Sequence, residues 1–527
     1  MDQSIESFLH AVVRMRMQKE KKREGEQVIA VSETVSAAAS AYESIRNTLE
    51  YDEEHLVRRN AIRRHLKRRW NEESTEKIAM DLLRELIWAR YLPNKQMPEE
   101  MIQVIAGVLD KYRLLFDAVK DQRRRREQSY LWILDVLSTE IEYALAPPLV
   151  DEALASLAYA ELRKRMAWES QIVAEQDRDL QLFIAIHRTV LKSNIPTLRF
   201  RILTLFYPGW TKLSAADPLV KEIAGNLGTV IRSVDSQLSY KGIEGLTRLI
   251  RRHAALFHVL RDMAEDDPEA FAKALEAKDA KALDAALSKA LDSRYARFQS
   301  KLQRSVFRAV LFLFLTKMIL ALLIEWPYEQ IVLQTTNPYP LLVNIIFHPV
   351  LLGIIALTVR IPEKKNTALI LEAAHGVLGL GTDFSVMFRR RRTWSTGAAG
   401  MVFQVMYALF AMLTIGVIIS ALHTFSFNPV SIAFFLFFLC LVMYFGFKIR
   451  GSKRDIVIVE QSNGFFGIIG DILFLPIIRA GRWISLRAPR INIFLFFFDF
   501  IIEAPFKAAI RLIESWLAFL REKKEEI

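Results

Sequence analysis

A single lysine interrupts the apolar segment FLTKMILALLIEWPY, which spans residues 314–328. Lys317 lies nine residues after Arg308. At the helical rise, this places it about 13 Å beyond that charge. A charged residue at the centre of a spanning helix costs about 2.5–3.5 kcal/mol on insertion scales, so such a residue is a candidate for function.

Two more polar residues can lie at a similar depth. His348 precedes Arg360 by twelve residues, which corresponds to about 18 Å of helix, and Gln404 lies about 10 Å from Gly397. Lys317, His348 and Gln404 therefore form a candidate intramembrane polar site, with donors suited to an anion or a lipid headgroup. We expect no carboxylate counter-ion for Lys317 within the spans. The alternative is that Lys317 extends toward the headgroups while His348 and Gln404 join helices.

Carboxylates near the C-terminus form a second candidate group. Asp499 and Glu503 are four residues apart and would share a helix face, where two carboxyl groups can perform acid–base chemistry. Ion pairs with nearby basic residues are the simpler interpretation. The candidate interfacial carboxylates are Asp471, Asp499 and Glu503.

Other sequence features argue against established catalytic classes. The single cysteine, Cys440, can form neither an intrachain disulfide nor a cysteine-based metal site. GFKIRGSK, residues 446–453, lacks the Gly-Lys-Ser/Thr order of a phosphate-binding loop. His253 and His258 are five residues apart with no third ligand in view. We predict no cofactor and no metal. An enzyme acting on lipid ranks last, because no pair of nucleophile and base is recognisable.

Four apolar segments are long enough to cross about 30 Å of hydrocarbon. The predicted transmembrane region covers residues 306–447, with spans at 306–326, 341–359, 398–422 and 429–447.

The loops predict the orientation of these spans. The first and third loops carry no Lys or Arg, whereas the second includes Arg389, Arg390, Arg391 and Arg392. Residues 1–300 hold 47 Lys and Arg against 45 Asp and Glu, and residues 301–527 hold 24 against 14, so the excess positive charge belongs to the apolar part. Basic residues mark the cytoplasmic side of a membrane. We therefore expect both termini in the cytoplasm of a multi-pass protein of the plasma (inner) membrane.

Two shorter apolar runs follow the fourth span, at residues 464–478 and 491–502. Treating them as spans would place Arg479 and Arg482 outside, against the charge pattern. We predict that residues 448–527 form interfacial or re-entrant helices on the cytoplasmic face. The candidate contacts with anionic lipid are Arg389, Arg390, Arg391, Arg392, Arg479 and Arg482.

The N-terminal part predicts an all-α fold. Residues 1–278 have few Gly and Pro, and apolar residues recur every three or four positions, as in packed helices. Residues 279–305 contain no helix breaker before the first span and predict a stalk helix that continues into it. The expected architecture is a cytoplasmic helical domain, a long stalk helix, four transmembrane helices and C-terminal interfacial amphipathic helices.

Basic clusters in this part could indicate nucleic-acid binding. Residues 56–70 contain seven Lys and Arg, but acidic residues precede them and an apolar stripe runs through them. A helix face with local ion pairs explains this pattern, so we consider nucleic acid an unlikely partner.

The C-terminal segments DILFLPIIRAGRWIS and INIFLFFFDFIIEAPFKAAI, together with LTKMILALLIEWPYE, resemble a family of uncharacterised bacterial multi-pass inner-membrane proteins with a large N-terminal cytoplasmic helical domain. The resemblance implies a bacterial inner-membrane location and no particular activity.

These observations favour a membrane-anchored cytoplasmic adaptor or scaffold, with a bilayer containing anionic headgroups, a cytoplasmic protein and a second copy of the chain as expected partners. The alternative is a small oligomeric transporter or channel that uses the polar site around Lys317. A polar cavity open to both sides would favour transport, and tightly packed spans would favour the anchor.

Overall fold

The computed structural model confirms the all-α prediction. It describes residues 3–20, 27–33, 36–37, 39–40, 43, 56–70, 74–120, 126–168, 173–240, 242–334, 339–359, 363–381, 385–388, 398–453, 456–458, 465–487, 512 and 516. Within these ranges, regular strand is limited to β1 (Met166–Trp168) and β2 (Val386–Phe388), which pair in parallel. Arg389–Arg392, Asp499 and Glu503 lie outside the described residues.

The chain divides into two compact units. Unit 1 comprises residues 1–2, 161–172 and 248–490, and unit 2 comprises residues 3–160, 173–247 and 491–527. In unit 1, arginines of α14 (Ala280–Leu320) pair with an acidic residue of α12 (Ile243–Asp266). Arg294 and Arg297 both contact Asp262, at 2.7 and 2.8 Å. Most of α12, from Arg248 onward, and all of α13 (Pro268–Glu276) therefore belong with the long helix.

Unit 2 is a bundle of amphipathic helices around an apolar core. Its larger helices include α1 (Gln3–Glu20), α3 (Val57–Arg69), α4 (Thr75–Trp88), α5 (Glu100–Lys120), α6 (Arg126–Leu145), most of α7 (Leu149–Arg165), α8 (Arg178–Thr189), α9 (Ile195–Phe206), α10 (Pro218–Gly225) and α11 (Leu227–Leu238). In α4, Ile78, Leu82 and Leu86 recur at intervals of four and are at most 1% exposed. This spacing places them on one face of the helix, toward the core.

The basic helix α3 is neutralised by acidic residues of other helices. Arg58 and Arg63 bind Glu142 and Asp135 of α6 through their Nε atoms, and Arg68 binds Glu85 of α4 at 2.8 Å. The sequence predicted local ion pairs for this helix, whereas the acidic partners observed here come from other helices.

A buried polar cluster also crosses the core of unit 2. Lys111 Nζ donates to Glu140 Oε1 at 2.5 Å and to the Trp210 carbonyl at 2.9 Å. Tyr112 and the Trp210 indole both donate to Glu140 Oε2. Burial, together with the adjacent Glu140 carboxylate, raises the pKa of Tyr112 well above its ordinary value. The cluster ties α5 and α6 to the loop after α9, and each of its charges is paired.

The predicted continuous helix into the first span is present as α14. Asp279 caps its N-terminus by accepting hydrogen bonds from Lys281 and Ala282 backbone N–H groups. The first four turns bury Leu283, Leu287, Leu291 and Tyr295 on one stripe. Part of that face is covered by α16 (Glu363–Val377), where Asn366 donates to the Tyr295 hydroxyl at 2.8 Å and His375 contacts Asp284 at 2.7 Å.

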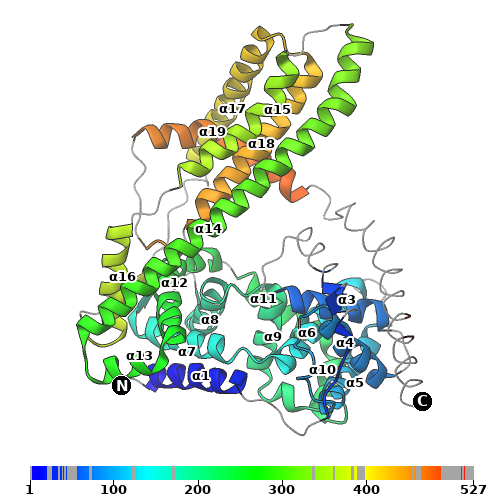
Figure 1. Cartoon of the computed structure of the whole chain (residues 1–527), viewed down its shortest axis with the longest axis vertical. Coiled ribbons are helices and arrows are strands. Elements are labelled where there is room, and N and C mark those ends of the chain that lie inside the picture. Colours follow the sequence, from blue (N-terminus) through cyan, green and yellow to red (C-terminus); the bar gives the residue numbers. More distant parts are fainter. Residues whose placement is uncertain are drawn as a thin grey trace. The chain divides into compact units, whose positions relative to one another are not determined.

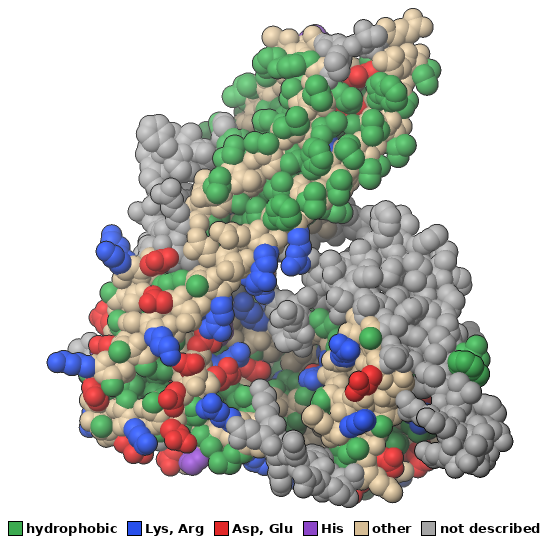
Figure 2. Space-filling model, viewed as in Figure 1, with side chains coloured by type: hydrophobic (Ala, Val, Ile, Leu, Met, Phe, Trp, Pro, Cys, Tyr) green, Lys and Arg blue, Asp and Glu red, His purple; other side chains and the backbone are tan. Residues whose placement is uncertain are grey.

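Among the described helices, four are long and apolar enough to cross a membrane, as predicted. They are α14 with its continuation to Val332, α15 (Tyr339–Leu357), α17 (Ala398–Thr424) and α18 (Pro429–Ser452). The continuation includes two π-helical turns, η4 (Ala321–Glu325) and η5 (Tyr328–Val332). Figure 1 shows these four helices side by side, and Figure 2 shows many apolar side chains on the face of the spans that is in view. The protein is therefore a membrane protein.

The predicted helix at residues 464–478 is longer than expected. It forms α19 (Phe465–Arg487), with Pro476 inside, and it packs closely on α18. Gly481 permits this approach, because a Cβ atom there would lie 1.9 Å from the Cys440 carbonyl oxygen. Ile477 joins an apolar cluster with Phe435 and Leu439 of α18.

Candidate intramembrane polar site

Lys317 is buried inside the helical bundle and does not extend to its surface. Its side chain is 0% exposed, and Nζ donates to Asn344 Oδ1 of α15. The ammonium group also lies 4.5 Å from the centre of the Phe438 ring of α18, a distance suited to a cation–π interaction. The cost of burying this charge is therefore offset by contacts from two neighbouring helices.

Glu325 is the unexpected acidic member of this cluster. Asn344 Nδ2 donates to Glu325 Oε2 at 2.7 Å, and the Ser431 hydroxyl contacts the same oxygen at 3.3 Å. Asn344 thus links an ammonium group to a carboxylate through the two ends of one amide. The expectation that Lys317 has no carboxylate counter-ion within the spans is wrong, because Glu325 lies in the last turn of the first predicted span and is 1% exposed.

A second carboxylate continues the polar chain along the bundle. Asn428 caps α18 by accepting from the Ser431 backbone N–H at 2.8 Å, and its side-chain amide donates to Glu329 Oε1 at 2.9 Å. Glu329 follows Glu325 by four residues and is 6% exposed. We call Lys317, Asn344, Glu325, Ser431, Asn428 and Glu329 the polar column.

His348 joins α15 to α18 beside this column. Its Nε2 lies 2.9 Å from the Phe435 carbonyl, and its Nδ1 lies 3.2 Å from the Asn344 carbonyl four residues earlier. His348 is 0% exposed and packs against the Phe435 ring. These contacts agree with the interpretation in which His348 joins helices.

The remaining predicted residues lie away from the polar column. Gln404 is exposed on α17, so the structure does not bring it to Lys317 and His348. Arg479 and Arg482 are exposed on α19, where the Arg479 guanidinium lies 4.6 Å from the Tyr407 ring of α17. Asp471 lies within α19. Figure 2 shows Lys and Arg side chains where the apolar surface ends.

An apolar layer occupies the bundle on the other side of Lys317. Leu313, Leu352, Phe438 and Val442 pack together, and each is at most 4% exposed. Farther along, Arg450 near the end of α18 binds the Thr358 hydroxyl at 3.0 Å. The polar column therefore lies between Lys317 and the connection between α17 and α18, whereas the apolar layer lies on the side of Lys317 toward the basic helix ends.

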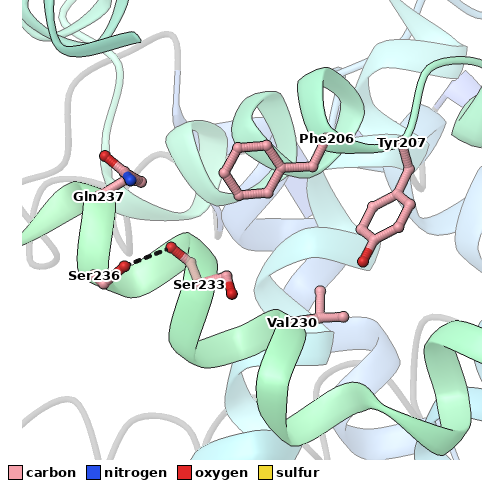
Figure 3. Close-up of a pocket in the computed structure, with 6 residues that line it drawn as sticks. All are labelled: Phe206, Tyr207, Val230, Ser233, Ser236 and Gln237. Carbon is pink, nitrogen blue, oxygen red and sulfur yellow. Dashed lines mark hydrogen bonds between the residues drawn. The ribbon is translucent and has the colours of Figure 1, made fainter. Parts of the chain in front are cut away.

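A separate pocket lies in unit 2, outside the spans. Phe206 and Tyr207 at the end of α9 face Val230, Ser233, Ser236 and Gln237 of α11 around a volume of about 450 Å³ (Figure 3). The Ser236 hydroxyl donates to the Ser233 carbonyl at 2.8 Å, so its proton is already used within the helix. The described residues that line the pocket present aromatic rings, an apolar side chain and neutral polar groups.

Among the residues that the structure describes, no cluster of three His, Cys, Asp or Glu is suited to a metal. Comparison with protein-family models, curated proteins and solved structures found no match for this chain.

The sequence signals for the polar column were incomplete. Lys317 and His348 attract attention as polar residues within apolar runs, whereas Glu325 lies at the end of a span, where a charge is ordinary. Asn344 and Ser431 are neutral and occur near helix starts. The signal that could have found Glu325 is its spacing of eight residues from Lys317, which returns to a similar helix face after about two turns.

Proposed function

We propose that this protein is a membrane-anchored scaffold whose helical part outside the spans binds a protein partner. The observation that carries this proposal is the apolar layer between Lys317 and the basic ends of the helices. Leu313, Leu352, Phe438 and Val442 fill the bundle with apolar side chains, so the polar groups of the spans do not form a route from one end to the other. Stable anchoring accounts for such a bundle without transport.

The size and order of the helical part support the same proposal. Unit 2 has a close-packed core in which the buried Lys111 is paired with Glu140, as a stable binding platform requires. Helix α14 supports the anchoring role, because one continuous helix has a start capped by Asp279 outside the spans and an apolar end that can cross the membrane.

We further propose that both termini lie in the cytoplasm and that the membrane is the bacterial inner membrane. The support is the distribution of basic residues, since Arg308 and Arg450 belong to the same end of the bundle and basic flanks favour the cytoplasmic side. Exposed Arg479 and Arg482 would contact anionic headgroups, and a second copy of the chain could bind the exposed face of α17.

The test is cross-linking in native membranes, followed by purification and mass spectrometry. The full chain is compared with a chain that begins at residue 280, and membrane insertion of both is verified. A specific protein captured by the full chain and lost on truncation supports the scaffold. Capture of the same proteins by both chains, or of no other protein by either chain, contradicts it.

The second candidate is a small oligomeric transporter or channel, favoured by the buried contact of Lys317 with Asn344. Ion or solute flux in liposomes tests this function, with Lys317→Leu as the variant. Flux by the wild-type chain that Lys317→Leu abolishes would favour transport over the scaffold.

A further inference from the structure

We propose that Glu325 is a proton-binding site inside the bundle, reached from the end at which α17 and α18 are connected. This site goes beyond the scaffold function, because a passive anchor has no need of an exchangeable proton. The proposal rests on an unpartnered oxygen, on the groups that surround it and on the one-sided distribution of polar residues in the bundle.

The first observation is the state of the two Glu325 oxygens. Oε2 is contacted by the Asn344 amide and the Ser431 hydroxyl. Oε1 is buried and accepts no hydrogen bond from any described residue. An unpaired buried carboxylate oxygen is costly, since its lost hydration is not replaced. A proton on Oε1 removes the charge from that oxygen while Oε2 keeps both of its donors.

The second observation is the charge balance around Glu325. The titratable groups of the same polar column are Lys317 of α14, which shares the Asn344 amide with Glu325, and Glu329 of η5. His348 of α15 lies beside the column and contacts the Asn344 carbonyl, and α18 contributes the neutral Ser431 and Asn428. The carboxylates of Glu325 and Glu329, four residues apart, therefore share the one ammonium group of Lys317 within the polar column. Protonating one carboxylate leaves one positive and one negative charge, and this state is balanced in a medium of low dielectric constant.

The third observation gives the route. Polar groups lie between the connection of α17 with α18 and Glu325. Asn428 contacts Glu329 and the Ser431 backbone N–H, and the Ser431 hydroxyl contacts Glu325 Oε2. On the other side, Leu313 and Val442 belong to the apolar layer, which offers no proton carrier. Binding transfers a proton from hydronium at the connection end to Glu325 Oε1, forming one O–H bond and releasing water. Release reverses both changes.

Local backbone geometry is consistent with a functional position. Glu325 ends the π-helical turn η4, and Glu329 lies in the π-helical turn η5, within a helix that is otherwise α-helical. Such turns occur frequently at functional sites, because they displace side chains from the regular α-helical register. Here they allow two carboxylates, four residues apart, to contact different residues near the start of α18.

The test is infrared difference spectroscopy of the full chain in lipid bilayers, which detects the C=O stretch of protonated carboxyl groups as pH changes. Glu325→Gln retains a similar shape and both contacts to Oε2 but cannot titrate. The matched control is Glu363→Gln, because Glu363 is exposed at the start of α16 and lies outside the polar column. We expect the wild type and Glu363→Gln to show a pH-dependent band that Glu325→Gln lacks. Identical difference spectra for the wild type and Glu325→Gln would overturn the proposal.

A second variant distinguishes the loss of the carboxyl group from a failure to fold. Glu325→Asp keeps a carboxyl group, so its band should persist at a shifted frequency, and an unchanged band in a folded Glu325→Asp chain would assign the signal elsewhere. The direction of access is tested in sealed vesicles, where a thiol label on His423→Cys in a Cys440→Ala background reports which side the connection faces. Acidifying that side should change the band. A response only to the opposite side would refute the route.

Discussion

Replacing Lys317 by Met should destabilise the membrane bundle, because the buried Glu325 carboxylate would lose the positive charge beside it. The variant leaves Asn344 Oδ1 without its donor and removes the positive charge beside the buried Glu325. Breaking a buried charged pair by removing one partner costs about 3–5 kcal/mol. Added apolar packing against Phe438 would recover only part of this cost.

A double-mutant cycle separates the charge from the lost hydrogen bond. In Lys317→Met combined with Glu325→Gln, no charge remains at either position. The residual cost is then the unpaired Asn344 oxygen, about 1–3 kcal/mol. We therefore expect the two substitutions to be non-additive, with a coupling of about 2 kcal/mol. This exceeds the average of about 0.6 kcal/mol for a polar contact between membrane helices.

Cys440 provides a probe for this measurement, because it is the only cysteine of the chain and is half-buried on α18. Its rate of reaction with a thiol reagent during stepwise SDS unfolding in mixed micelles reports the opening of the bundle. Lys301→Met is the control, because Lys301 is exposed on the same helix and its loss should change stability by less than about 0.5 kcal/mol. Additive costs in the cycle, or a Lys317→Met chain as stable as wild type, would refute the reasoning.

Three further predictions concern other parts of the chain. Gly481→Ala should weaken the packing of α19 on α18 by about 1–3 kcal/mol, measured by the same thiol reaction, because its Cβ would meet the Cys440 carbonyl; Gly416→Ala, with open space around its Cβ, should not. Asp267→Ala should cost about 1 kcal/mol in chemical denaturation, because Asp267 accepts from the Ala270 backbone N–H as the N-cap of α13; a cost below 0.3 kcal/mol would contradict this role. Burial lowers the pKa of His187 to about 3, so the unfolded chain binds more protons between about pH 3 and 6.5, and stability should rise with pH across this window by at most about 1.4 kcal/mol per pH unit. Thermal unfolding of His187→Phe should show a smaller slope, and an unchanged slope would show that His187 does not contribute.

The arginines of α3 show what a local pattern can and cannot predict. The sequence indicates a helix with an apolar stripe and a basic face, and both are observed. It suggested that nearby acidic residues would balance the charge, whereas Arg58 binds Glu142, which is 84 residues away. Charge neutralisation by another helix depends on which helices pack together, and the spacing along one helix carries no such information.

The sequence by itself determined the helical class, the four apolar spans and the continuous helix that enters the first of them. These features follow from local properties, since length, apolar content and the absence of breakers act within one helix. Only the tertiary structure decided that Asn344 joins Lys317 to Glu325, that Gln404 faces away from them and that an apolar layer closes one half of the bundle. Depth along a helix can be counted from the sequence, but the direction in which a side chain points toward its neighbours is set by packing between helices.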